Sequence, residues 1–171
     1  MKLIISNTLR SDGINVAVAN QLKKGGVHVH RLHHKAPYLG EYDLKDVDEC
    51  HVHHFTHSGI FGSMVPQVTS AGVPVIYHCH STVMQEMKFE DVVGEMRLMQ
   101  LAGQEEMFNC ADKVLFFSDM QKEYSVSKHP EITEKSEVFK YSFDGKLGSG
   151  EREDGRVLFV GQLIPKKRVR A

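Results

Sequence analysis

Residues 2–32 read KLIISNTLRSDGINVAVANQLKKGGVHVHRL, and this stretch decides the fold class. The apolar run Lys2–Ser6 predicts a strand. Apolar residues at helical spacing in Ile14–Leu22 predict a helix, and the two glycines that follow shortly afterwards mark its end. The alternation in Val27–Leu32 predicts a second strand. A strand, a helix and a strand within about thirty residues form a βαβ unit, whose strands are parallel.

The same alternation of strands and helices continues along the chain. Strands are predicted at 49–55, 73–79, 113–117 and 137–141, and helices at 58–71, 91–110 and 119–125. Pro66 predicts a kink in the first of these helices. The apolar residues expected to face the core from helix 91–110 are Val92, Met96, Met99, Ala102, Met107 and Phe108. The pattern predicts an α/β fold with an open, doubly wound, mostly parallel, Rossmann-like sheet, which binds ligands at the carboxyl ends of its strands.

Composition narrows the class of protein. The chain has 171 residues, 41% of them hydrophobic, and a formal net charge of −1. These values are typical of one globular domain, and the absence of a basic excess argues against nucleic acid as a partner. No apolar run approaches the ~20 residues of a membrane span. The three cysteines are odd in number and widely spaced, which favours a reducing, cytoplasmic setting over a disulfide framework.

Histidine is unusually frequent, with eleven in the chain. Six of them form pairs two residues apart, within predicted strands or directly at the end of one: His28/His30, His51/His53 and His78/His80. Each pair faces one side of its strand, and the second and third pairs would converge if the strands that carry them are neighbours. Imidazoles are common zinc ligands, but no accompanying zinc motif is present. Hydrogen-bonded histidines are therefore favoured over a metal site, and no metal or cofactor is predicted.

Near its end the chain carries a second kind of motif. An apolar strand pattern at Val157–Val160 is followed by Gly161-Gln162-Leu163-Ile164-Pro165-Lys166-Lys167-Arg168. This segment resembles the donor site of glycosyltransferase family 4, the retaining nucleotide-sugar transferases of GT-B fold, whose pattern is roughly Gly-Arg-Leu-x-Pro-x-Lys-Gly. The resemblance places Gly161 and Lys167 at the donor diphosphate. Gln162 stands where the family has arginine, and Arg168 where it has glycine.

Other segments extend the resemblance in the right order along the chain. Asp48–His53 is similar to the family's Asp-Val-Val-His-Val-His strand, and Gly72–Ser81 to Gly-Ile-Pro-Val-Val-Tyr-Thr-Val-His-Asp. Cys110–Ser118 resembles Ala-Asp-Arg-Val-Ile-Ala-Val-Ser. The family match makes His80 the candidate catalytic residue, with a structural histidine as the alternative. It also implies an acceptor-binding set, which comprises Gly13 in the turn after the first strand, His53 and Ser118.

The resemblance implies transfer of a sugar from a nucleotide-sugar donor to a hydroxyl of a sugar or lipid-linked acceptor. It divides the chain into an acceptor-binding domain at 1–147 and a linker with the start of a donor domain at 148–171. The chain ends six residues after Pro165, so it is expected to represent only the acceptor side of such an enzyme. A cytoplasmic location follows, and peripheral association with a membrane stays open.

An apolar strand without its own domain is expected to pair elsewhere. We therefore expect self-association through Val157, Leu158, Phe159 and Val160. The alternative to an enzyme is a non-catalytic Rossmann-like module that binds a sugar, a phosphorylated ligand or a partner chain. A histidine-rich metal-binding protein is the third and weakest alternative.

Overall fold

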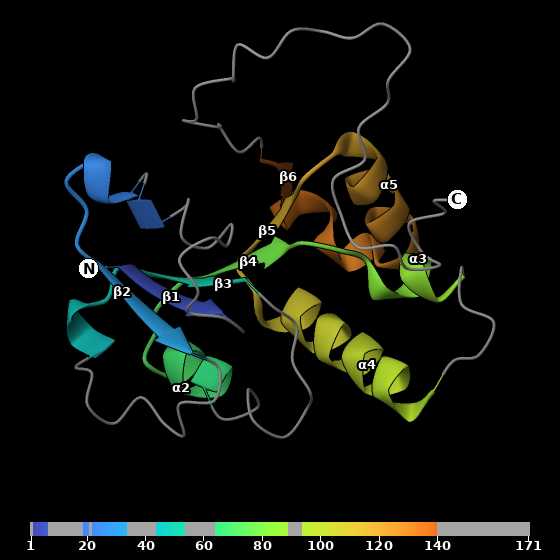
Figure 1. Ribbon diagram of the computed structural model, residues 1–171, viewed down its shortest axis with the longest axis horizontal. Helices are drawn as coiled ribbons and strands as arrows, with labels where there is room; N and C mark the ends of the chain where they lie inside the picture. The colour runs from blue at the N-terminus through green and yellow to red at the C-terminus, as the bar shows by residue number, and fades with distance from the viewer. Residues whose placement is uncertain are drawn as a thin grey trace, which may run out of the picture.

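The sheet is the centre of the molecule. The computed structural model describes residues 2–6, 19–20, 22–33, 44–53, 64–88 and 94–139. Within these ranges six parallel strands form one sheet in the order β2-β1-β3-β4-β5-β6 (Figure 1). The strands are β1 (Lys2–Ser6), β2 (Val29–His33), β3 (Glu49–Val52), β4 (Val75–Cys79), β5 (Lys113–Phe116) and β6 (Ser136–Val138). The predicted α/β fold with a parallel sheet is confirmed.

Strand order reverses next to β1. The chain runs from β1 to β2 in one direction and from β3 to β6 in the other. The helical elements are α2 (Met64–Ser70), α3 (Val83–Met87), α4 (Glu95–Cys110) and α5 (Asp119–Lys128), with short 3-10 turns η1 (Leu44–Asp46) and η3 (Pro130–Lys135).

The two faces of the sheet differ in chemistry. Cys50 and Val52 of β3 belong to the main hydrophobic core, together with Val68 of α2 and Phe108 of α4. We call this side the core face, and α2 and α4 lie on the same side of the sheet in Figure 1. The residue between Cys50 and Val52 in β3 points to the other side of the sheet, since side chains alternate along a strand. There His51 is buried, and we call this side the histidine face.

The strand predictions hold in position and differ at the ends. β2 begins at Val29, two residues after the predicted start, and β3 ends at Val52. The structure adds α3 and η3, which the sequence did not predict. Helix α2 begins at Met64, which places Pro66 in its first turn. A first-turn residue has no intrahelical acceptor for an N–H, so proline fits there. The part of the predicted helix before Met64 lies outside the described residues, so the kink at Pro66 stays a prediction.

The apolar stripe predicted for α4 was only partly right. Met107 and Phe108 are buried, whereas Met96 is 56% exposed and Ala102 is exposed. The reason is the position of the helix, whose C-terminal half lies under the sheet while its N-terminal half extends past it (Figure 1). The buried side instead includes Gly103 and Gln104. Helical spacing alone does not tell how far along its length a helix stays covered.

Asp112 fastens the start of β4 to the start of β5. Its Oδ2 accepts a hydrogen bond from the Val75 N–H at 2.8 Å, and its own N–H donates to the Val75 carbonyl at 2.9 Å. The side-chain bond completes a pairing that the strand ladder does not supply at this end. Asp112 thereby fixes the register in which β4 leaves the turn after α2.

We expect Asp112→Ala to lower the free energy of unfolding by about 1–2 kcal/mol, because the Val75 N–H loses its acceptor next to the core. Glu106→Ala, at an exposed position of α4, serves as the control and should change stability by about 0.5 kcal/mol or less. Urea unfolding of both variants measures the difference. Equal stabilities would show that water replaces the carboxylate without loss.

Several sequence predictions fall outside the described residues. They concern Gly13, Gly161 and Lys167, the domain segment 148–171, and the self-association segment Val157–Val160. Among the residues that the structure describes, none of the helices combines the length and apolar character needed to cross a bilayer.

Candidate functional site

The candidate site lies directly after β4, at the edge where the carboxyl ends of the strands meet. The strand forms because Val75–Cys79 is β-branched and aromatic, and three of its side chains enter the core. His80 and Ser81 then leave the sheet, and α3 begins at Val83. Ligands of open parallel sheets bind at this edge. His80 is therefore placed where the sequence predicted a site residue.

Gln104 of α4 binds the loop between β4 and α3, which carries His80, through two hydrogen bonds. Its Oε1 accepts a hydrogen bond from the Val83 N–H at 2.9 Å, and its Nε2 donates to the Ser81 carbonyl at 2.7 Å. The side chain is 1% exposed, so these bonds are formed away from water. Buried bonds of this kind are costly to break, which fixes the backbone on both sides of Thr82.

Helix α5 holds the same loop from the other side. Gln121 Nε2 donates to the Cys79 carbonyl at 3.1 Å, while its Oε1 accepts from the Phe117 N–H at 3.1 Å. The hydroxyls of Thr82 and Ser125, both buried, lie 3.2 Å apart and share a hydrogen bond. The loop that carries His80 is thus attached to two helices as well as to its strand, which leaves it little freedom to move.

His80 has two ring neighbours. Its Nε2 is hydrogen-bonded to Nδ1 of His53 at 3.1 Å, and its ring centroid lies 5.0 Å from that of Phe117. His53 is 4% exposed, whereas His80 is only partly buried. A ligand at this edge would therefore meet His80 first, with His53 behind it. His53 was predicted to bind the acceptor. Because His53 is buried and hydrogen-bonded to His80, a ligand would contact His80, and His53 would act on the ligand only through His80.

Four imidazoles form a continuous row on the histidine face. His51 Nδ1 and His78 Nε2 are hydrogen-bonded at 2.9 Å. The ring of His78 stacks on that of His53, with centroids 4.0 Å apart and an interplanar angle of 17°. His80 then follows. We call His51, His78, His53 and His80 the histidine row.

The strand register explains the row. β3 and β4 are neighbours, and Val52 lies opposite Tyr77, so one residue further on His53 lies opposite His78. The prediction that the second and third histidine pairs converge is confirmed. The first pair lies elsewhere, since β2 is separated from β3 by β1.

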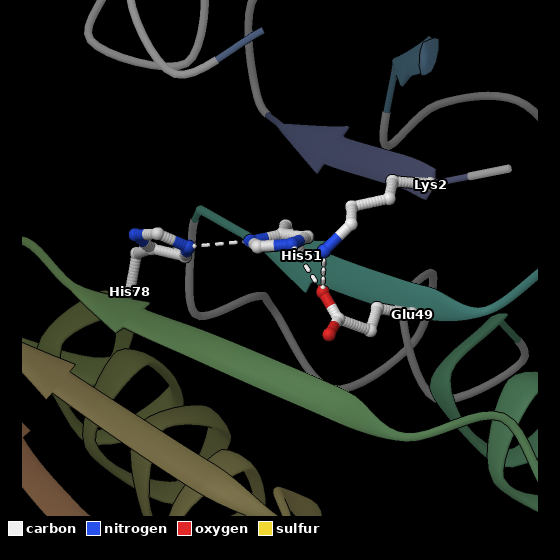
Figure 2. Close-up of polar contacts among 4 residues, drawn as sticks. All are labelled: Lys2, Glu49, His51 and His78. Carbon is white, nitrogen blue, oxygen red and sulfur yellow. Dashed lines mark hydrogen bonds and ion pairs between the residues drawn. The ribbon is translucent and has the colours of Figure 1, made fainter. Parts of the chain in front are cut away.

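An ion pair lies at the other end of the row. Glu49 Oε2 accepts a hydrogen bond from His51 Nε2 at 3.2 Å and also contacts the ammonium group of Lys2 (Figure 2). The row therefore runs across the sheet face, from the amino ends of β1 and β3 to the carboxyl ends of β3 and β4. Figure 2 shows one carboxylate oxygen of Glu49 in contact with both Lys2 and His51.

The protonation states follow from burial and from this ion pair. Burial opposes the charge on Glu49, but Lys2 and His51 outweigh it and lower the pKa of the carboxyl group below its usual value. Burial lowers the pKa of His51 and, together with the neighbouring imidazoles, holds the pKa of His78 well below 6.5. Burial also lowers the pKa of His80 to about 4. At neutral pH the carboxylate is charged and these three rings are neutral.

Ser118 has a structural task. Its hydroxyl accepts a hydrogen bond from the Gln121 N–H at 3.2 Å, which caps the N-terminus of α5. Asp119 follows in the first turn and complements the positive end of the helix dipole. Ser118 follows Phe117, which contacts His80, so the residue lies at the predicted edge of the sheet while its hydroxyl is engaged with the helix.

Sequence reasoning found the histidines but missed the residues that support them. Gln104, Gln121 and Glu49 carry no motif, and a glutamine in a helix is more often a surface residue. The interpretation of these histidines as hydrogen-bonded groups is confirmed for the histidine row. Within the described ranges, the carboxyl, thiol and imidazole groups form no cluster of three or more that could hold a metal ion.

Comparison with models of known protein families found no match, and comparison with curated proteins found no significant one.

Proposed function

We propose that this chain is the acceptor-side domain of a retaining glycosyltransferase of family 4 type, with a Rossmann-like fold. The observation that carries the proposal is the position of His80, at the carboxyl end of β4 on a loop fixed by Gln104 and Gln121. The reversal of strand order beside β1 supports it, because ligands of doubly wound sheets bind near such a reversal. The sequence segments that resemble the family supply the reaction class.

In this proposal His80 orients the acceptor hydroxyl. A group with a pKa of about 4 is a weak base at neutral pH, so proton abstraction is not its main task. A neutral imidazole still donates or accepts one hydrogen bond, and it does so without attracting phosphate. The acceptor oxygen then bonds to the anomeric carbon of the donor sugar as the bond to the nucleoside diphosphate breaks, and the proton of the acceptor hydroxyl passes to the leaving diphosphate oxygen. The resemblance assigns the leaving diphosphate to Gly161 and Lys167.

A binding module without catalysis is the second candidate, and the low basicity of His80 favours it. The same edge would then hold a sugar or a partner chain and transfer nothing. One measurement separates the two candidates, since only the transferase releases a nucleoside diphosphate from a nucleotide sugar in the presence of an acceptor.

We expect His80→Ala to reduce acceptor-dependent release of nucleoside diphosphate at least about tenfold, the cost of one hydrogen bond. The free energy of unfolding should fall by about 1–3 kcal/mol, because Nδ1 of the buried His53 loses its partner. His28→Ala, at an exposed position before β2, is the matched control and should retain activity. The assay uses the full-length chain with a panel of nucleotide sugars and acceptors. A large loss of thermal stability with unchanged turnover would make His80 a structural residue.

A further inference from the structure

The direction of each hydrogen bond at the start of the histidine row follows from one fixed group. The carboxylate of Glu49 only accepts, so His51 Nε2 carries the hydrogen of the bond between them. His51 is neutral, and its Nδ1 is therefore an acceptor. His78 Nε2 must then donate to it across the 2.9 Å contact. One ion pair at the edge of the sheet thus sets the tautomers of two buried rings.

The second half of the row is held by packing. The His53 ring lies flat against that of His78, and stacking at 4.0 Å fixes the plane of His53. His53 Nδ1 is then directed at His80 Nε2, at 3.1 Å. Phe117 flanks His80 at 5.0 Å. The orientation of the His80 ring is therefore determined from within the protein.

This arrangement leaves one nitrogen of His80 for a ligand. Nε2 is engaged with His53, so Nδ1 is the atom that remains. An imidazole in two exchanging tautomers would present a donor for part of the time and an acceptor for the rest. A single tautomer presents one of the two at all times, which discriminates between ligand groups.

We propose that the histidine row is a positioning device: Glu49 sets the tautomers of His51 and His78, stacking on His78 fixes the plane of His53, and the hydrogen bond to His53 holds His80 in one orientation and one tautomer, so that a ligand meets only its Nδ1. His53, His78 and His51 are positioning residues and touch no ligand themselves. The proposal rests on the proposed function only for the identity of the ligand, because the order of the row is a property of the free chain.

Nitrogen-15 NMR of the histidine side chains in the free chain at pH 7.5 tests this order. We expect His51 and His78 to show the tautomer protonated at Nε2, and His80 to show one protonated and one unprotonated nitrogen. Averaged nitrogen shifts for His80 in the wild-type chain, or protonation of His78 at Nδ1, would overturn the proposal. No ligand is needed, so the result is independent of sugar transfer.

Two pairs of variants, at His53 and at Glu49, test which residue fixes the tautomer of each ring in the histidine row. His53→Leu removes the partner of His80, and we expect the two His80 nitrogen shifts to move to averaged values. His53→Asn keeps an amide near the position of Nδ1 and should restore the single tautomer. Glu49→Gln keeps an acceptor oxygen for His51, whereas Glu49→Leu does not and should release the tautomers of His51 and His78. A single His80 tautomer that persists in His53→Leu would contradict the role of His53.

Discussion

Between pH 6.5 and pH 4 the folded chain is expected to lose stability steeply. His51, His78 and His80 have pKa values in the folded state below the 6.5 of the unfolded chain. In this range the unfolded chain therefore binds more protons than the folded one, so the free energy of unfolding falls as the pH falls. For His80 alone, a pKa that is lowered from 6.5 to about 4 on folding contributes about 3 kcal/mol to the free energy of unfolding, and this contribution is lost as the pH falls through that range.

Urea unfolding at several pH values between 7.5 and 4.5 measures this loss. The carboxyl group of Glu49, whose pKa is lowered from 4.5, contributes only below that range, so the two effects separate. His78→Gln keeps a donor for His51 but removes a titrating ring, and it should make the dependence on pH shallower. Gln67→Ala, at an exposed position of α2, removes no titrating group and is the control, so it should leave the dependence on pH unchanged. A free energy of unfolding that stays constant down to pH 5 would mean that protonation of the histidine row does not destabilise the fold.

Gln104→Leu is expected to cost about 3 kcal/mol of stability or more. Leucine is similar in size to glutamine but has no amide, so the substitution leaves the Val83 N–H and the Ser81 carbonyl without their partner. Each buried group left in this state costs about 1–3 kcal/mol. The same change frees the loop of His80, so the backbone amide of Val83 should also exchange with solvent faster.

Gln100→Leu provides the matched control, one turn earlier on the same helix. Gln100 accepts a hydrogen bond from Arg97 at 2.6 Å on a partly exposed surface, and its loss should cost about 0.5 kcal/mol or less. Thermal unfolding and hydrogen exchange compare the two variants. Similar stabilities would show that the loop finds other partners when Gln104 is absent.

The strands of this protein were predictable because their signal is local. The apolar runs at Lys2–Ser6 and Val75–Cys79 each form a strand within the predicted range. The convergence of the histidine pairs also followed from spacing, since residues two apart in a strand share a face. What the sequence did not contain was the register of β3 against β4, which decides that His53 stacks on His78.

The supporting residues were not predictable for a different reason. Gln104 is buried because the second half of α4 passes beneath the loop after β4, and a helical pattern does not show where a helix meets its sheet. The first half of α4 misled the prediction in the opposite way, since Met96 is apolar and exposed. Both errors concern the placement of an element that was itself predicted correctly.

The supports of the His80 loop all come later in the chain than the loop itself. The separations are 21 residues from Val83 to Gln104, 42 from Cys79 to Gln121 and 43 from Thr82 to Ser125. A ribosome therefore delivers β4 and the loop after it well before the side chains of Gln104, Gln121 and Ser125 that bind this loop. The nascent chain carries this loop without its contacts to Gln121 and Ser125 until α5 has emerged, so the candidate site is completed late in synthesis, after the strands on either side of it have been made.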